Sequence, residues 1–420
     1  MKCKLLATTM LAAAFLVGCT MQNNNTSTNS NALIRAGLKN KCGYIDTTGH
    51  WVIRPQFDNV WDFSENGLAR VELNSKFSFI NKTGKMITKP QFDDFGYFAR
   101  NGLACVKFNG KWGYIDTTGH WVINPQFDDV WPFSENGLAR VETNSKYGYI
   151  DTTGNWVIKP QFFAYADSFA ENGLACVKLN GKWGYIDKTG HWAIKPQFEN
   201  AYIFAENGLA RVCLNGKWGY IDKTGHWVIK PQFDDVRYFP ENGLARVKLN
   251  SKYGLNSKYG YIDTTGNWVI NLQFDDVWDF AENGLAAVKL NGKWGYIDKI
   301  GKWVINPQYD NARNFAKNGL ARVCINDKWG YIDKTGHWVI NPRFDNAWDF
   351  DENGLARVVL NGNYGFVVET GKWVTNPQYD DIRIFENTIF FKQNGKWGII
   401  DKNGNIVAKP KFDWVVYKNL

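Results

Sequence analysis

The stretch Asn207 to Val236 reads NGLARVCLNGKWGYIDKTGHWVIKPQFDDV, and close copies of it fill the chain from about Ala32 to the C-terminus. Counted from the aromatic-Gly pair, there are eleven copies, mostly 35 residues apart, at Cys42, Phe77, Trp112, Tyr147, Trp183, Trp218, Tyr259, Trp294, Trp329, Tyr364 and Trp397. Self-similarity at a fixed period predicts units that bury their apolar faces only by stacking on their neighbours.

The period is interrupted at a few steps. The step from Tyr147 to Trp183 is 36 residues and the last step is 33. The step from Trp218 to Tyr259 is 41, because LNSKYG occurs from Leu249 and again from Leu255. A six-residue slip of this kind indicates a surface connection.

Local signals within the unit predict strands. Residues 209–214 alternate, and across the copies the positions of Ala210, Val212 and Leu214 stay mostly apolar, whereas those of Arg211 and Cys213 vary. The variable face is therefore expected to point outward. Asn-Gly at 215–216 predicts a two-residue hairpin turn of type I′.

The rest of the unit continues the same pattern. Residues 218–222 form the return strand of the hairpin, and 223–225 are interpreted as a three-residue turn with Gly225 in the left-handed conformation. A third strand is expected at 226–229. The PQFDDV segment after it predicts a short fourth strand or an irregular arm.

We expect an all-β fold of about eleven 35-residue β-meander repeats. A closed β-propeller usually holds four to eight blades of four strands, so eleven units fit one ring poorly. Two rings in tandem would need a linker or a broken repeat, and the LNSKYG duplication is too repeat-like for that. The sequence favours an open, solenoid-like superhelix over one or two β-propellers. Degraded terminal copies are expected as its caps.

The N-terminus has the features of a secretory signal. Residues 1–18 are basic at Lys2 and Lys4 and apolar from Leu5 to Val17, a run too short for a spanning helix, which needs about 20 residues. The ending Leu-Val-Gly-Cys19 resembles the lipobox of bacterial lipoproteins, in which Cys19 would be lipidated and become the mature N-terminus. In that family a residue other than Asp after the Cys, here Thr20, favours outer-membrane sorting.

Three regions follow from this interpretation: a lipoprotein signal peptide (1–18), a lipidated Cys with a disordered polar tether (19–31), and the repeat array (32–420). The tether sequence TMQNNNTSTNSN has too little apolar surface to fold. The whole chain is 44% hydrophobic and 16% aromatic and has 40 glycines, a composition typical of turn-rich β-structure.

Charge and cysteine usage are not diagnostic of a site. The net charge is +8 and falls to about +6 without Lys2 and Lys4, and the basic residues sit singly. We expect a solvated outer face, with weak attraction to anionic envelope polymers as the alternative, and no nucleic-acid partner. The cysteines beyond Cys3 and Cys19 are sporadic substitutions in single copies, so free thiols on the variable face are expected rather than disulfides.

The polar residues that could hold a metal or catalyse a reaction recur at fixed places. All five histidines follow the turn Gly, where sister copies have Lys or Asn, which favours an exposed turn residue over a metal ligand. Paired carboxylates such as Asp234-Asp235 change to Asp-Asn in other copies, so turn-building explains them better than glycosidase chemistry. We expect no metal, no cofactor and no catalytic residue. An enzyme would need single-copy polar residues, and none is evident.

One position does have the composition of a contact surface. It follows the paired acidic residues and holds Trp, Tyr or Arg, types that are enriched where proteins bind partners. Its alternative role is packing against the next repeat, with Arg extending to solvent. The candidate partner-binding residues are Trp61, Trp131, Tyr202, Arg237, Trp278, Arg313, Trp348 and Arg383.

The motifs KWGYIDKTGHWVI and PQFDDV, repeated eleven times over about 32–420, resemble the bacterial WG-repeat (KWG-repeat) family. This resemblance implies an all-β repeat protein, often in the bacterial envelope and usually without an assigned activity. The copies at Cys42 and Phe77-Ser78 depart from Trp-Gly. We therefore predict a lipid-anchored envelope scaffold, on the periplasmic or surface face of the outer membrane, that binds a protein or glycan. The alternatives are a structural envelope protein and, less favoured, a glycan-acting enzyme.

Overall fold

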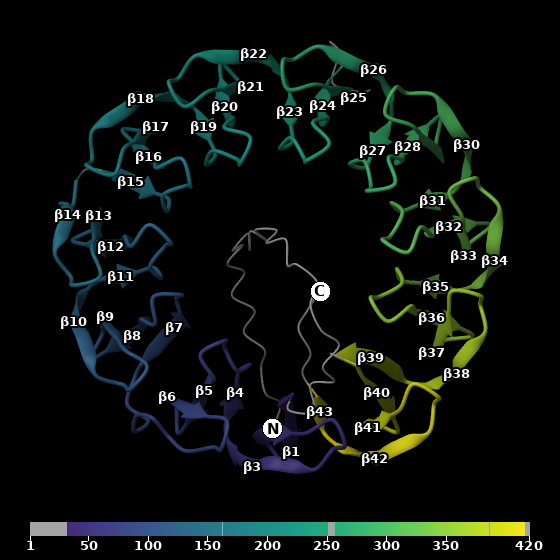
Figure 1. Cartoon of the computed structure of the whole chain (residues 1–420), viewed down its shortest axis with the longest axis horizontal. Coiled ribbons are helices and arrows are strands. Elements are labelled where there is room, and N and C mark those ends of the chain that lie inside the picture. Colours follow the sequence, from purple (N-terminus) through teal and green to yellow (C-terminus); the bar gives the residue numbers. More distant parts are fainter. Residues whose placement is uncertain (1–31, 162, 251–256, 386, 416–420) are drawn as a thin grey trace.

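The chain forms a closed ring of β-sheets and not an open superhelix. A computed structural model describes residues 32–161, 163–250, 257–385 and 387–415. These residues build eleven sheets, ten of four strands and one of three, arranged as the blades of a single β-propeller (Figure 1). The favoured open array was therefore wrong, and one ring, part of the stated alternative, is the fold. The signal segment, Cys19, the tether and residues 251–256 within the LNSKYG duplication lie outside the described residues.

Each blade is an antiparallel sheet whose strands follow one another from the ring axis outward. We number the blades 1 to 11 in chain order. The innermost strands are β43 (Trp414–Val415), β4 (Asn59–Val60), β7 (Asp94–Phe98), β11 (Asp129–Val130), β15 (Phe163–Ala166), β19 (Asn200–Ala201), β23 (Asp235–Val236), β27 (Asp276–Val277), β31 (Asn311–Ala312), β35 (Asn346–Ala347) and β39 (Asp381–Phe385). The second strands are β1 (Ile34–Leu38), β5 (Leu68–Leu73), β8 (Ala104–Phe108), β12 (Ala139–Thr143), β16 (Ala175–Leu179), β20 (Ala210–Leu214), β24 (Ala245–Leu249), β28 (Ala286–Leu290), β32 (Ala321–Ile325), β36 (Leu355–Leu360) and β40 (Thr388–Gln393).

The outer half of each blade is equally regular. The third strands are β2 (Lys41–Ile45), β6 (Lys76–Asn81), β9 (Lys111–Ile115), β13 (Lys146–Ile150), β17 (Lys182–Ile186), β21 (Lys217–Ile221), β25 (Lys258–Ile262), β29 (Lys293–Ile297), β33 (Lys328–Ile332), β37 (Asn363–Val368) and β41 (Lys396–Ile400). The outer strands are β3 (Trp51–Phe57), β10 (Trp121–Phe127), β14 (Trp156–Ile158), β18 (Trp192–Phe198), β22 (Trp227–Phe233), β26 (Trp268–Phe274), β30 (Trp303–Tyr309), β34 (Trp338–Phe344), β38 (Trp373–Tyr379) and β42 (Ile406–Phe412). In blade 2 two isolated bridges replace the outer strand.

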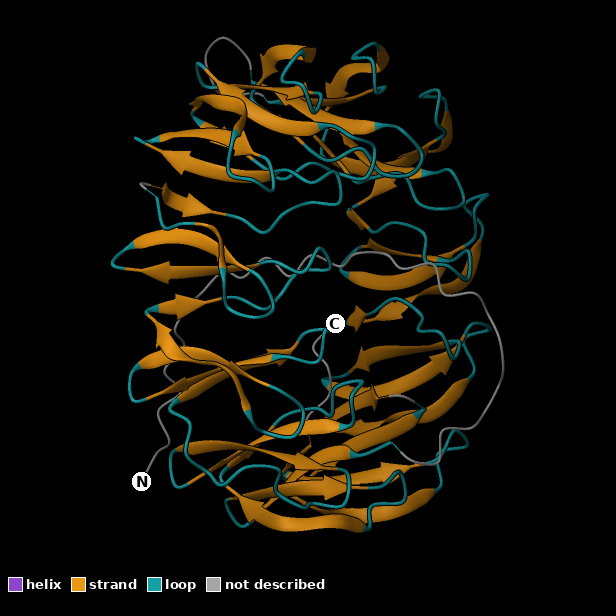
Figure 2. Cartoon of the chain, turned by 60° about the vertical axis from the view of Figure 1, so that its left-hand side comes forward, coloured by secondary structure: helices purple, strands orange, loops and turns teal. Residues whose placement is uncertain are grey.

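Strands and connecting loops make up the ring, as Figure 2 shows. Within the described part of the chain, no helix is long and apolar enough to cross a membrane.

The hairpin predicted in the repeat unit is present. Asn215 and Gly216 both have positive φ, 53° and 70°, and join β20 to β21 as a type I′ turn requires. Gly225, with φ 87°, closes the next turn before β22. The short strand predicted after the Pro is β23, and it belongs to the following blade.

The outer strand continues through the proline, contrary to the expected end at Ile229. Pro is tolerated there because β22 is an edge strand and its register to β21 shifts around Pro231. The shift brings the outer strand onto Gly219, where an added Cβ would lie 2.4 Å from the Ile229 carbonyl oxygen. The Gly of the Trp-Gly pair is therefore required by close backbone approach.

The two ends of the chain complete one blade together. The first copy supplies three strands of blade 1, and β43 from the C-terminus pairs with β1 as its innermost strand. The Asp413 amide also donates to the Gly37 carbonyl at 2.9 Å. The degraded terminal copies are therefore not caps on an open array, because each supplies part of the same sheet.

The core lies between blades, so both faces of the second strand are buried. In one interface Cys176 and Tyr185 of blade 5 pack against Ala210 and Val212 of blade 6. The expectation of an outward face at Arg211 and Cys213 was wrong, since both side chains are buried. A ring of blades covers the two faces of every sheet, unlike a sheet with one solvated face.

Buried tyrosine hydroxyls join eight of the blades to the next, and Phe79, Phe366 and Ile399 occupy the same position in the other three. Tyr261 of blade 7 donates to the carbonyl of Trp278 in blade 8 at 2.6 Å, and Tyr296 donates to the carbonyl of Arg313 at 2.7 Å. Burial raises the pKa of both hydroxyls well above its ordinary value. The same bond is made by Tyr44, Tyr114, Tyr149, Tyr185, Tyr220 and Tyr331.

The tryptophan of the Trp-Gly pair is half-buried at Trp218 and fully buried at Trp294 and Trp397. The five described cysteines are free thiols as expected, but they are buried between blades and not on an outward face.

Candidate binding surface around the central opening

The eight candidate contact residues gather around the ring axis. Each follows or lies in the innermost strand of its blade, and the innermost strands surround the central opening of Figure 1. We call this place in each blade the contact position. Arg237 and Tyr202 are exposed, and Tyr202 is 37% exposed. The other six, Trp61, Trp131, Trp278, Arg313, Trp348 and Arg383, are half-buried.

Packing and partial exposure coexist at the contact position. The guanidinium of Arg140, on β12, lies 3.6 Å from the ring centroid of Trp131 in the same blade. Arg357 lies 3.8 Å from the ring of Trp348. Both alternatives considered for this position, packing and partner contact, therefore agree with the geometry. Binding at these residues stays a prediction.

Three arginines are flanked by aromatic rings from two blades. Arg70 lies 5.1 Å from the Trp61 ring of its own blade and 4.0 Å from the Tyr97 ring of the next. The guanidinium of Arg211 lies 4.2 Å from Tyr202 and 3.8 Å from Tyr238 in the same manner. Such contacts stabilise a desolvated cation.

Arg140 completes this set of three. Its guanidinium contacts Trp131 as described and lies 5.5 Å from the ring of Tyr165 in blade 5. Arg70, Arg140 and Arg211 are the buried arginines of the described chain, 9%, 6% and 7% exposed. Aromatic residues thus follow the wall of the opening from blade 2 to blade 7.

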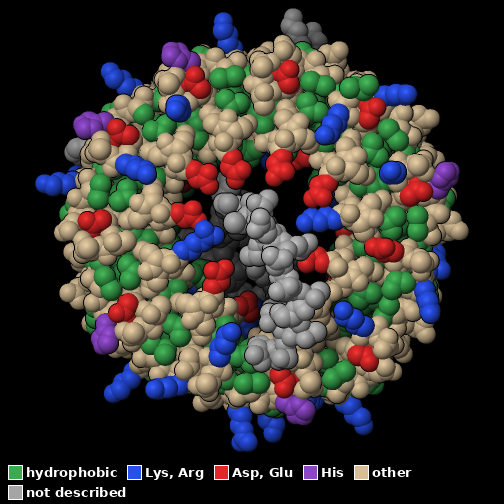
Figure 3. All heavy atoms as spheres, viewed as in Figure 1, with side chains coloured by type: hydrophobic (Ala, Val, Ile, Leu, Met, Phe, Trp, Pro, Cys, Tyr) green, Lys and Arg blue, Asp and Glu red, His purple; other side chains and the backbone are tan. Residues whose placement is uncertain are grey.

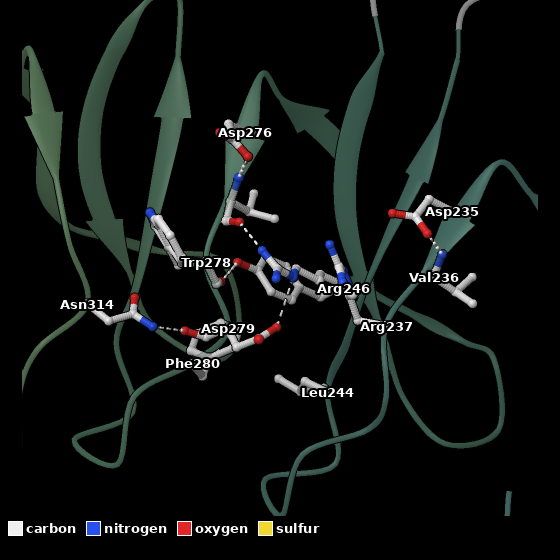
Figure 4. A network of polar contacts seen from close by, with 12 residues as sticks. Asp235, Val236, Arg237, Leu244, Arg246, Asp276, Trp278, Asp279, Phe280 and Asn314 are labelled. Atoms are coloured by element: carbon white, nitrogen blue, oxygen red, sulfur yellow. Dashed lines mark hydrogen bonds and ion pairs between the residues drawn. The ribbon is translucent and has the colours of Figure 1, made fainter. Parts of the chain in front are cut away.

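Other arginines at the same place in the second strand form ion pairs with a carboxylate of the next blade instead of contacting aromatic rings. Arg246 of blade 7 donates to the Val277 carbonyl at 2.7 Å, and its Nε lies 3.1 Å from Asp279 of blade 8 (Figure 4). Asn314 of blade 9 in turn donates to the Asp279 carbonyl at 2.6 Å. The polar network therefore runs through three successive blades at the wall of the opening.

We call the residue after the contact position the bridging position. From blade to blade, its residue type varies together with that of the second-strand residue it faces in the preceding blade. Arg is matched by Asp or Tyr in the pairs Arg35 and Asp62, Arg70 and Tyr97, Arg211 and Tyr238, Arg246 and Asp279, and Arg322 and Asp349. Without Arg the bridging residue is of another type, as in the pairs Cys105 and Pro132, Cys176 and Ile203, and Ala287 and Asn314. Two interfaces depart from this rule: Arg357 faces Ile384 and pairs with Asp381 at 3.6 Å, and Arg140 uses the contact position of blade 5.

That contact position holds Asp167, which the sequence comparison missed. Its amide donates to the Cys176 carbonyl, the bond that Trp61 and Tyr202 make in their blades. Burial raises the pKa of the Asp167 carboxyl, although Arg140 lies 3.9 Å away and opposes the shift. The sequence does indicate this position, because the step from Tyr147 to Trp183 is 36 residues instead of 35 and so contains one inserted residue before Asp167. A single-copy carboxylate therefore exists where none had been expected.

The paired acidic residues have structural tasks, but in blade connections and not in isolated turns. Asp58, the first of its pair, accepts from Lys41 of blade 1 at 2.5 Å and from the Asn74 amide of blade 2 at 2.6 Å. The ion pair with Lys41 is the main cause that lowers the pKa of Asp58. The second residue, such as Asp235, accepts from the following amide at 3.0 Å.

The histidines are exposed on the outer turns. His226 lies with its Nδ1 2.6 Å from the Thr224 hydroxyl, next to the Asx turn that Asp222 forms. In the described part of the chain, no cluster of three or more His, Cys, Asp or Glu side chains is placed to hold a metal ion.

Charged side chains border the opening and project from the circumference. On the face of Figure 3, acidic side chains lie around the central opening together with some Lys and Arg, and Lys, Arg and His project from the rim. The turns between innermost and second strands reach towards the axis in Figure 1 and carry an exposed charged residue each. Those residues are Glu65, Arg100, Glu135, Glu171, Glu206, Glu241, Glu282, Lys317 and Glu352.

Fold and wall geometry together define a large β-propeller with a mixed aromatic and charged central surface. Comparison with protein families finds a WG containing repeat eleven times along the chain. The matches cover residues 43–77, 77–112, 112–147, 147–183, 183–218, 218–253, 259–294, 294–329, 329–364, 364–397 and 397–418. The chain belongs to the WG-repeat family. No curated protein matches it.

Solved structures match this chain at low identity and low TM-score. The crystal structure of the eukaryotic initiation factor is 10% identical over 92% of this chain and 97% of that chain, with a TM-score of 0.46. Kluyveromyces lactis Hsv2p is 12% identical, over 57% of this chain and 97% of its own, with a TM-score of 0.30. Saccharomyces cerevisiae Sqt1 is 11% identical, over 67% and 94%, with a TM-score of 0.28. These likenesses carry no information about function.

Proposed function

We propose that this WG-repeat propeller is a lipid-anchored, non-catalytic scaffold of the bacterial cell envelope that binds a protein or glycan partner at its central opening. The observation that supports it is the gathering of the contact positions around one axis. Residues from eight blades, all Trp, Tyr or Arg and all at least partly exposed, follow or lie in the innermost strands that surround it. Such residue types carry most of the binding energy in protein interfaces.

The anchor rests on the sequence ending in Cys19, which lies outside the described residues. Two or more acyl chains give stable membrane attachment where a single chain does not. The full-length protein should therefore fractionate with membranes, and the Cys19→Ala variant should appear in the soluble fraction. A Cys19→Ala protein that stays quantitatively with membranes contradicts the anchor. The outer membrane, on its periplasmic or surface side, is the proposed location.

The binding role is tested by photo-crosslinking in intact cells. A photoreactive amino acid replaces Tyr202, which is 37% exposed at the opening, or Trp268, which is 38% exposed on the outer strand of blade 7. An adduct is expected from position 202 and not from the equally exposed position 268. Adducts from both positions, or from 268 alone, contradict binding at the opening. Absence of any adduct favours the alternative, a structural envelope protein.

A further inference from the structure

The large hydrophobic side chains that stay exposed fall into two groups. Most lie on outer strands or on the turns before them, as Val52, Trp268 and Ile300 do. The remaining ones are Tyr97, Tyr165 and Tyr202, which are 64%, 41% and 37% exposed. All three belong to innermost-strand segments, in blades 3, 5 and 6. Exposed aromatic rings that gather on one surface are a feature of contact sites.

Each of these tyrosine rings is fixed by a buried guanidinium. Arg70 lies 4.0 Å from the Tyr97 ring and Arg211 lies 4.2 Å from the Tyr202 ring. Tyr165 has Arg140 at 5.5 Å on one side and Trp183 at 5.2 Å. A ring held in this way loses little conformational entropy when a ligand stacks on it.

Polar acceptors lie on innermost strands in the same part of the ring, in blades 3, 4 and 7. Asp94, Asp129 and Asp235 lie on innermost strands, and Oδ1 of each accepts from the amide of the next residue at 2.8, 2.9 and 3.0 Å. The second carboxylate oxygen of each makes no hydrogen bond within the described chain and is free to accept hydroxyl protons. Flat ring faces beside hydroxyl acceptors match the chemistry of a sugar, which has apolar C–H faces and hydroxyl edges.

The arginines that hold the rings recur in every second blade, whereas the three exposed tyrosines lie in blades 3, 5 and 6. The buried arginines with their aromatic flanks belong to blades 2, 4 and 6, and the intervening interfaces have Cys105 and Cys176 in place of Arg. A surface that repeats along a curved wall fits a polymer that repeats along its length. Seven glutamates against Arg100 and Lys317 leave the turns at the mouth net acidic, which disfavours a polyanion.

We propose that the aromatic stripe of Tyr97, Tyr165 and Tyr202, with the carboxylates beside it, binds a neutral linear polysaccharide chain. The rings stack on pyranose faces and the free carboxylate oxygens accept hydroxyl protons. This assignment rests on the proposed binding scaffold and narrows its partner to a glycan.

The test is native affinity electrophoresis of the full-length protein, solubilised in a mild detergent. Gels contain one of the neutral polysaccharides hydroxyethylcellulose, glucomannan or dextran, or the anionic alginate. Wild-type protein is expected to be retarded by at least one neutral polysaccharide and not by alginate. Each change of Tyr97, Tyr165 or Tyr202 to Ala should weaken that affinity about tenfold, the ratio of a typical hot-spot loss. The triple variant should lose retardation.

Matched variants separate stacking from folding. The triple Tyr→Phe variant keeps the rings and should bind within about threefold of the wild type. Trp268→Ala removes an equally exposed outer ring and should not change binding. Thermal unfolding confirms that the variants fold, and a variant that does not is replaced by the corresponding Tyr→Ser change.

Several outcomes overturn the glycan assignment. These are retardation by no neutral polysaccharide, retardation by alginate alone, or wild-type affinity in the triple Tyr→Ala variant. A protein adduct at position 202 in cells, without polysaccharide retardation, refutes the glycan and leaves the binding scaffold intact. Absence of both signals refutes the scaffold as well.

Discussion

Arg246 of blade 7 forms an ion pair with Asp279 of blade 8, with 3.1 Å between Nε and Oδ1, and its Nη1 donates to the neighbouring Val277 carbonyl at 2.7 Å. The same ion pair recurs between Arg35 and Asp62 and between Arg322 and Asp349. Tyrosine replaces the carboxylate at two other interfaces, where the arginine is more deeply buried. The two residues of a pair are 27 positions apart in sequence, or 33 where the LNSKYG duplication intervenes, and they change type together because they face each other across adjacent blades.

A double-mutant cycle should detect this pairing. Arg246→Ala and Asp279→Ala are each expected to lower the free energy of unfolding, with a coupling of about 1 kcal/mol, since Arg246 is largely buried and Asp279 half-exposed. Chemical denaturation at low salt measures the four proteins. Arg237→Ala, at an exposed position nearby, serves as the control. Strictly additive effects would show that the contact contributes nothing.

Removing one interblade hydroxyl should be measurable. Tyr261→Phe leaves the Trp278 carbonyl without its donor and should cost about 1 kcal/mol of unfolding free energy. Tyr259→Phe, two residues away on the same strand but half-buried, is the matched control and should cost less than about 0.5 kcal/mol. Equal costs for the two changes would reject the hydroxyl bond as an interblade link.

Acid should weaken the blade connections. The Lys41 ion pair and the Asn74 amide lower the pKa of Asp58, and corresponding lysines lower those of Asp93 and Asp345. A folded-state pKa below the unfolded value of about 3.9 gives stability that is full above that pH and is lost as the pH falls through the folded pKa. The melting temperature should therefore fall below about pH 4. Asp58→Asn should melt lower than wild type at pH 7 but alike at pH 2, and a difference that persists at pH 2 contradicts this account.

The buried thiols should be unreactive in the folded protein. Burial raises the pKa of Cys105 to about 12 and that of Cys42 to about 11, which leaves almost no thiolate at pH 8. Reaction with Ellman's reagent should be no faster than global unfolding, and it should be complete in guanidinium chloride. Rapid labelling of either thiol in native protein would mean that its blade interface opens locally.

Closure of the ring should depend on Val415. This residue is 4% exposed and packs with Ile34 and Ala36 where β43 meets β1. Val415→Asp places an unpaired charge there and should cost about 3 kcal/mol or more, with a larger radius of gyration in small-angle scattering. Val407→Asp, 45% exposed on the outer strand of blade 11, should change neither quantity. An unchanged Val415→Asp protein would place the stability of the ring elsewhere.

Part of the candidate site was accessible from the sequence. Comparison of copies identified the contact position, because a site that holds both Trp131 and Arg237 is unlike a fixed core position. Asp167 was missed because one inserted residue shifts it out of alignment with Trp131. The role of Arg211 was misjudged, since variation at that position comes from a partner in the next blade and not from exposure to solvent.

Local chemistry in the sequence determined the strands, the Asn215-Gly216 hairpin turn and the repeat itself, because alternation, positive-φ residues and period act over a few neighbouring residues. Only the tertiary structure decided between an open array and a closed ring. That choice depends on the small rotation from blade to blade and on whether β43 reaches β1, a contact between the two ends of the chain. The pairing of Arg246 with Asp279 likewise appears only when the blades are placed side by side. Closure of the ring depends on the sum of many small rotations between neighbouring blades, and the sequence of one repeat does not indicate the size of that rotation.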